Sequence, residues 1–141
     1  MALKSTSMKN LVFLCTGNTC RSIMAEAIAR QRGAGRWRVH SAGVEPEGVV
    51  NAQALEVLGR HGVPVEDLHS KGIAALGSLR PDVVVTVCNH AARTCPTSLA
   101  AGQVLHRPLP DPSKVPPDER EQAFEQAYRT ICALVDELQA I

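Results

Sequence analysis

Residues 11–22, LVFLCTGNTCRS, decide the fold. Their apolar beginning predicts a buried strand that ends near Cys15. A helical pattern starts at Ile23, directly after this stretch. The small and polar residues between the two predict a tight loop. Its backbone N–H groups would lie at the positive end of the helix, where anions bind. We therefore expect a strand, an oxyanion-binding loop and a helix in direct succession.

Cys15 and Arg21 are the candidate catalytic residues of this loop. A thiol is a nucleophile only as its thiolate, which a helix N-terminus and a neighbouring cation both favour. Arg21 adds a planar charged group that can donate to two oxygens of a tetrahedral oxyanion. A buried cysteine beside an ordinary capping turn is the alternative, which the six-residue spacing and the strand–loop–helix context disfavour. The predicted oxyanion-binding loop comprises Thr16, Gly17, Asn18, Thr19, Cys20, Arg21 and Ser22.

Conformational roles follow for three members of the loop. Gly17 relieves crowding in the turn, and Asn18 tolerates a left-handed backbone. Ser22 is expected to donate a hydrogen bond to the sulfur of Cys15, to cap the helix, or to do both.

Length and composition exclude several classes of protein. The 141 residues predict a catalytic domain over residues 8–141 after a loose leader over residues 1–7. A net charge of +1 and the scarcity of aromatic residues give no indication of a nucleic-acid or membrane partner. No signal peptide is recognisable, so we expect a cytoplasmic protein. Five cysteines in such a chain point to chemistry or metal binding rather than structural disulfides.

Strands and helices alternate along the chain. Strands are expected over residues 10–14, 37–41, 82–87 and 104–106, and helices over residues 22–32, 52–61 with Asn51 as N-cap, 73–79 and 118–138. This alternation predicts a three-layer α/β fold with a four-stranded parallel sheet and helices on both faces. Ligands of such sheets bind beyond the carboxyl ends of the strands, where Cys15 is expected.

A second group of thiols lies in residues 88–96, CNHAARTCP. Cys88 ends the most apolar strand, and Cys95 follows across a polar segment without strong apolar periodicity. Zinc binding is a poor alternative because the spacing is not CxxC and only His90 is nearby, so no metal is expected. Two core cysteines would be the other alternative. A redox pair fits better, provided that the segment rearranges to bring the thiols together.

Asp111 lies in LPDPS, residues 109–113, after the last predicted strand. The proline that follows holds it extended, and its carboxyl group could act as a general acid over the loop. An Asp-Pro pair is usually only a turn, so the assignment depends on its place at the same sheet edge as Cys15.

CTGNTCRS, SAG at residues 41–43, VVVTVCNHAARTCP and the later DP together resemble the thioredoxin-coupled arsenate reductases. That family has the fold of the low-molecular-weight protein tyrosine phosphatases. The resemblance implies that Cys15 attacks arsenate held by the loop and Arg21, while Asp111 protonates the departing hydroxyl. Cys88 then attacks the sulfur of Cys15, two electrons pass to arsenic, and arsenite leaves. Cys95 finally attacks Cys88.

The resemblance also implies partners and supporting residues. Reduced thioredoxin would reduce the Cys88–Cys95 disulfide, phosphate or sulfate would mimic arsenate, and the protein would be a monomer without a tightly bound cofactor. Some relatives bind a monovalent cation beneath the loop through side chains matching Asn18, Glu26 and Ser41. Lys71 stands where their acidic ligand would be, so we expect its ammonium group to replace the cation and activity to be independent of potassium.

Three alternatives remain open. A phosphatase acting on phosphotyrosine is the first, although SKVPP follows the Asp-Pro pair where phosphatases of this fold commonly carry aromatic residues. A non-enzymatic protein binding an oxyanion, or binding arsenite through three soft thiols, is the second. A reductase that uses a small thiol is the third, and the presence of Cys88 and Cys95 disfavours it.

Overall fold

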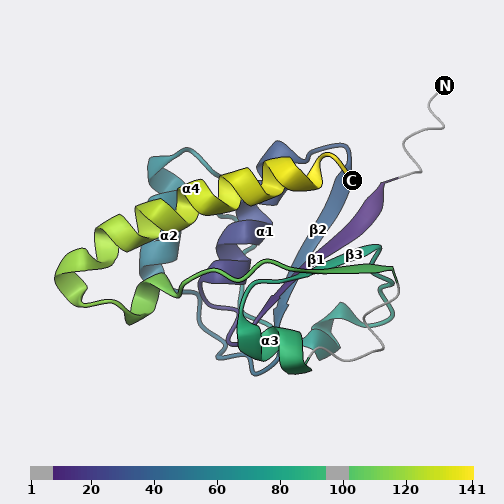
Figure 1. The fold of residues 1–141 in the computed structure, drawn as a ribbon, viewed down its shortest axis with the longest axis horizontal. Coiled ribbons are helices and arrows are strands. Elements are labelled where there is room, and N and C mark those ends of the chain that lie inside the picture. The colour runs from purple at the N-terminus through teal and green to yellow at the C-terminus, as the bar shows by residue number, and fades with distance from the viewer. Residues whose placement is uncertain (1–7, 95–101) are drawn as a thin grey trace.

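A four-stranded parallel sheet forms the centre of the molecule (Figure 1). The structure, a computed structural model, describes residues 8–94 and 102–141. Its strands are β1 (Lys9–Cys15), β2 (Trp37–Gly43), β3 (Val83–Thr86) and β4 (Gln103–His106), in the order β2-β1-β3-β4. The four predicted strands and their parallel arrangement are confirmed. β2 is two residues longer than predicted, because Ala42 and Gly43 stay in register with Leu14 and Cys15.

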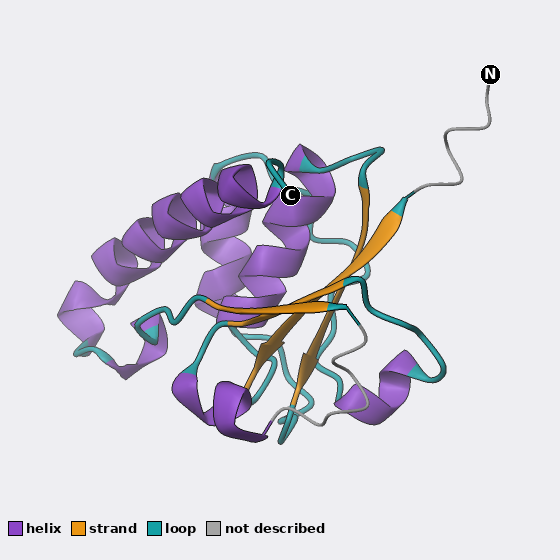
Figure 2. Cartoon of the chain, turned by 45° about the vertical axis from the view of Figure 1, so that its right-hand side comes forward, coloured by secondary structure: helices purple, strands orange, loops and turns teal. Residues whose placement is uncertain are grey.

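Helices cover both faces of the sheet, as Figure 2 shows. The helices α1 (Arg21–Arg32), α2 (Ala52–Arg60) and α4 (Arg120–Leu138) pack against one another on one face. In the strand order β2-β1-β3-β4, the chain moves toward one edge of the sheet from β1 to β2 and toward the other edge from β3 to β4. Right-handed crossovers therefore place α3 (Asn89–Thr94) on the face opposite α1, together with the one-turn helix η2 (Ile73–Leu76). The predicted three-layer α/β fold is confirmed.

Local sequence signals explain most helix boundaries. The side chain of Asn51 caps α2 by accepting from the backbone N–H groups of Gln53 and Ala54 at 2.8 and 3.2 Å, as predicted. The helix predicted over residues 73–79 is shorter, because Gly77 ends η2 in the left-handed region. α4 begins at Arg120, two residues later than predicted, since the short helix η5 (Pro117–Glu119) precedes it.

The apolar strands and one face of α4 form the core. Residues 11–14 of β1 are wholly buried. Five apolar residues on one face of α4 are buried too, namely Phe124, Ala127, Ile131, Val135 and Leu138. Each large side chain of this kind contributes about 1.5–3 kcal/mol to folding. In the part of the chain that the structure describes, no helix combines the length and apolar character needed to cross a membrane.

Candidate active site

Cys15 is the last residue of the central strand β1, and residues 16–22, the anion loop, lead from it into α1. Asn18 has a φ of 53°, so the predicted left-handed backbone is confirmed. A cavity of about 190 Å³ opens over this loop. The cavity is lined by Cys15, Thr16, Gly17, Thr19, Cys20, Arg21, Glu47, Asp111 and Lys114.

A hydrogen-bond network beneath the loop fixes Cys15. The side-chain amide of Asn18 donates to the hydroxyls of Ser22 and Ser41, at 2.7 and 3.0 Å. Since Ser22 Oγ accepts this hydrogen bond, its own proton is free to point at Cys15 Sγ, 2.9 Å away. Ser22 does not cap α1: it lies inside the first turn, and the N-cap residue Cys20 makes no side-chain capping bond. Of the two roles considered for Ser22, only the contact with Cys15 is present.

Glu26 is a buried carboxylate at the base of this network. Its Oε1 accepts from Ser41 Oγ at 2.5 Å and lies 3.4 Å from the ammonium nitrogen of Lys71. That nitrogen also donates to the carbonyl of His69 at 3.0 Å. Arg30 pairs with the second oxygen of Glu26. The buried negative charge is thus balanced by two cations.

Sequence reasoning overlooked Arg30. The available signal was its position four residues after Glu26 on a predicted helix, a spacing at which opposite charges meet.

Arg21 and Asp111 meet at the mouth of the cavity. Arg21 Nη2 lies 3.4 Å from Asp111 Oδ2, while its Nη1 donates to the carbonyl of Leu109 at 3.1 Å. The other oxygen of Asp111 accepts from the backbone N–H and the hydroxyl of Ser113, at 3.0 and 2.7 Å. The carboxyl group is therefore held at the same sheet edge as Cys15, with one oxygen toward the cavity.

Cys88 follows β3, the strand beside β1. Its sulfur lies 3.2 Å from the hydroxyl of Thr16 and accepts from the backbone N–H of Ala91 at 3.3 Å. The segment after Cys88, for which the sequence predicted no regular structure, begins as the helix α3. Cys95, and with it the second half of the predicted redox pair, lies outside the described residues.

Burial raises the pKa of the Cys20 thiol to about 12, and the negative charge of Asp111 contributes further. Cys20 therefore keeps its proton at neutral pH, and it cannot act as a second thiolate in the anion loop. Cys132 is a buried thiol on α4, away from the anion loop.

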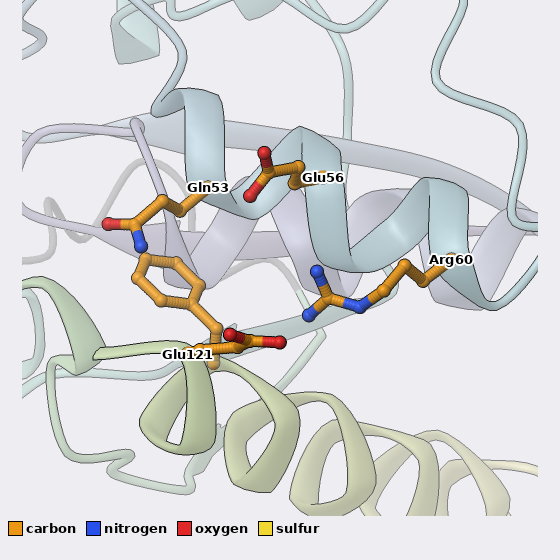
Figure 3. A pocket seen from close by; sticks show the side chains of 5 residues that line it. Gln53, Glu56, Arg60 and Glu121 are labelled. Carbon is orange, nitrogen blue, oxygen red and sulfur yellow. The ribbon is translucent and has the colours of Figure 1, made fainter. Parts of the chain in front are cut away.

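Outside the anion loop, the described residues offer no second site with evident chemistry. Among the residues that the structure describes, no group of three or more His, Cys, Asp or Glu side chains could hold a metal ion. A larger cavity of about 340 Å³ lies between α2 and α4, where Arg60 and two glutamates surround it (Figure 3). Arg60 is already paired with Glu125 at 3.0 Å. This second cavity has no nucleophile among its lining residues.

Two residues lining the cavity over the anion loop, Glu47 and Lys114, were also not singled out by the sequence. Neither follows an apolar period or a motif, so no signal in the sequence identifies them.

A cysteine that ends a central parallel strand, with an anion loop and a helix behind it, characterises proteins that bind tetrahedral oxyanions next to a thiol. A family model described as low molecular weight phosphotyrosine protein phosphatase matches residues 10–140, and the chain belongs to this family.

Several proteins similar to this chain bear the name arsenate reductase. An arsenate reductase of Bacillus cereus is 39% identical over 105 residues, which cover 74% of this chain and 78% of that protein. A solved structure of an arsenate reductase in the phosphate binding state is 26% identical, covers 92% of this chain and 98% of its own, and has a TM-score of 0.74. A thioredoxin-dependent arsenate reductase of Corynebacterium glutamicum shares the fold at 23% identity, with a TM-score of 0.71 and coverage of 96% and 64%.

Proposed function

We propose that this protein reduces arsenate to arsenite through Cys15, Cys88 and Cys95 in turn, and that thioredoxin restores the thiols. The observation that carries the proposal is the placement of Cys15 and Cys88 at the carboxyl ends of adjacent parallel strands. The Thr16 hydroxyl beside the Cys88 sulfur links the two positions. The names of the most similar relatives favour the same activity.

Arsenate binding uses the anion loop. Arsenate resembles phosphate in size and charge, so backbone N–H groups at the start of α1 and the guanidinium group of Arg21 can hold its oxygens. The hydrogen bond from Ser22 stabilises the thiolate of Cys15. Cys15 attacks arsenic and forms a sulfur–arsenic bond, while Asp111 gives a proton to the departing hydroxyl, which leaves as water.

Reduction takes place at sulfur. The thiolate of Cys88 attacks Cys15 Sγ, the sulfur–arsenic bond breaks, and its electron pair passes to arsenic. Arsenite leaves, and a Cys15–Cys88 disulfide remains. The thiolate of Cys95 then attacks Cys88 Sγ, which releases Cys15 as a thiolate and leaves a Cys88–Cys95 disulfide. A dithiol protein such as reduced thioredoxin supplies the two electrons that restore the pair.

Passing the disulfide outward has a geometric reason. Cys15 is only 3% exposed and lines the cavity, where a protein partner would have difficulty reaching its sulfur. A disulfide moved to Cys88 and Cys95 leaves the cavity free for the next arsenate. We place the protein in the cytoplasm, where thiols are kept reduced, and we assign no tightly bound cofactor and no metal to the reaction.

Glu26, Ser41 and Lys71 support the anion loop in this proposal. The ammonium group of Lys71 contacts the Glu26 carboxylate and lies 3.4 Å from Ser41 Oγ, so it stands where a monovalent cation would otherwise bind. The expected consequence is activity that does not depend on potassium.

Phosphotyrosine hydrolysis is the second candidate, because Cys15, Arg21 and Asp111 would also serve a phosphatase. Among the described residues lining the cavity there is no aromatic side chain to bind a phenyl ring. We therefore assign aryl phosphate hydrolysis as a weak side activity.

The test measures NADPH oxidation with arsenate, thioredoxin and thioredoxin reductase, alongside aryl phosphate hydrolysis. We expect clear turnover in the first assay and little in the second. Cys88→Ser should abolish arsenate turnover and retain the residual hydrolysis, whereas Cys132→Ala, which changes a core thiol on α4, should retain both. Arsenate reduction by Cys88→Ser would show that the relay is wrong.

A further inference from the structure

The segment after β2 is held against the anion loop by its backbone. The N–H groups of Val44, Glu45 and Glu47 donate to the carbonyls of residues 15–17 in turn, at 3.1, 2.8 and 3.1 Å. These bonds extend the pairing of β2 with β1 past the end of the sheet. The position of Glu47 beside the loop is therefore fixed by main-chain geometry, independently of its side chain.

The Glu47 carboxyl group lies over Gly17. A Cβ atom placed on Gly17 would come 2.8 Å from Glu47 Oε2 and 3.2 Å from its Cδ, so the carboxyl group would have to shift from its present position. The absence of a side chain at Gly17 thus leaves room for this carboxylate at the wall of the cavity. Asp111 and Lys114 belong to the same cavity lining.

Glu45 provides an internal comparison. It belongs to the same segment and its side chain is 71% exposed, but its carboxylate pairs with His90 at 3.0 Å instead of lining the cavity. Two glutamates two residues apart therefore differ in whether they face the anion-binding site.

We propose that Glu47 is a specificity-determining residue that favours inorganic oxyanions over organic phosphate monoesters. Free arsenate or phosphate carries a hydroxyl that can donate to the Glu47 carboxylate. The ester oxygen of a monoester carries carbon and has no proton to donate, so the carboxylate would face it without a hydrogen-bond donor. Repulsion between the Glu47 carboxylate and the bound anion weakens binding of the monoester. For the inorganic ion, the hydrogen bond from its hydroxyl to the carboxylate compensates for this repulsion. The inference rests on the proposed function only in naming arsenate as the preferred oxyanion.

Binding measurements test the proposal in the Cys15→Ser background, which removes turnover. Calorimetric titration with inorganic phosphate and with phenyl phosphate compares Glu47→Gln with the matched control Glu45→Gln. We expect Glu47→Gln to tighten phenyl phosphate binding about tenfold, as expected for removal of a like charge beside an anion, with a much smaller change for inorganic phosphate. Glu45→Gln should change neither affinity. An equal change for both ligands, or no change, would overturn the proposal.

A second measurement uses the intact nucleophile. In steady-state hydrolysis of an aryl phosphate, Glu47→Gln should raise kcat/KM about tenfold, and Glu45→Gln should not. An unchanged kcat/KM in Glu47→Gln would contradict the proposal even if the Cys15→Ser background binds phosphate poorly. Neither measurement involves arsenate reduction. If the coupled assay shows no arsenate reduction but Glu47→Gln binds phenyl phosphate more tightly, the proposed function fails and this inference stands. If arsenate is reduced but Glu47→Gln does not change phenyl phosphate binding, the proposed function stands and this inference fails.

Discussion

The hydroxyl of Thr16 lies 3.2 Å from the sulfur of Cys88, so the first residue of the anion loop contacts the thiol that follows the neighbouring strand. Thr16→Val keeps the side-chain shape and removes this hydrogen bond. A hydrogen bond to a charged group contributes about 1.5–3 kcal/mol, so we expect arsenite release in a single turnover to slow about tenfold or more. Aryl phosphate hydrolysis, which does not use Cys88, should change much less. Thr19→Val is the matched control, and an equal loss in both activities of Thr16→Val would contradict the assignment.

Cys95→Ser should stop the relay after about one turnover per enzyme molecule, because one disulfide can form and no internal thiol resolves it. Mass spectrometry of the arrested enzyme should find Cys15 joined to Cys88. Arsenite quantified by a rapid-mixing assay gives the size of the single turnover. A steady-state rate equal to that of the parent protein would remove Cys95 from the mechanism.

Asp111→Asn should slow both arsenate reduction and aryl phosphate hydrolysis, because both lose the group that protonates the departing oxygen. General acid catalysis of this kind contributes about 10²–10⁴-fold. Asp118→Asn, in the short helix η5, is the control for a change of charge near the same segment. Retention of the full rate with both substrates would show that Asp111 serves only its contacts with Ser113 and Arg21.

Lys71→Met should lower the free energy of unfolding by about 1–3 kcal/mol, since the buried Glu26 carboxylate would lose one of its two cations. Replacing sodium by potassium should leave the parent protein unchanged. The same exchange should partly restore stability and activity to Lys71→Met, because the potassium ion can approach the carboxylate. Lys9→Met, at an exposed position on β1, is the control. A clear rise in parent activity with potassium would contradict the assignment of Lys71.

The raised pKa of Cys20 should make the free energy of unfolding depend on pH in the alkaline range. Its thiol loses a proton near 9.0 in the unfolded chain and near 12 in the folded protein. Between these values the folded state binds more protons than the unfolded state, so the free energy of unfolding falls as pH rises. Urea unfolding at about pH 8 and about pH 10.5 should show a smaller fall in Cys20→Ala than in the parent. Identical falls would show that Cys20 does not retain its proton on folding.

The sequence alone was sufficient for the sheet and for the loop at its edge. The apolar run before Cys15 and the small residues after it have one simple solution, a buried strand entering a helix through a tight turn. The left-handed conformation of Asn18 follows from the same reasoning, and the structure has it. These features are local, so residue order and hydrophobic pattern determine them.

The features missed depend on contacts between distant segments. α3 carries only Ala91 as a buried residue, so its sequence has almost no apolar period. Its first turn is held by contacts with distant segments, namely the hydrogen bonds between Asn89 and His106 at 2.9 Å and between His90 and Glu45 at 3.0 Å. The proximity of Glu47 to Gly17 likewise depends on backbone pairing between residues 44–47 and 15–17, which no pattern within either segment reveals.

The backbone pairing between residues 44–47 and 15–17 divides the pocket into two parts. The anion loop binds the oxyanion, and the segment 44–47 contacts the group that the oxyanion carries. Side chains at positions 45 and 47 can be exchanged while the amides that fix the segment stay in place. Directed evolution that randomises these two positions can therefore explore new ester substrates without rebuilding the nucleophile's surroundings. Such changes would alter which oxyanions and esters reach Cys15, whereas reduction would still require Cys88 and Cys95.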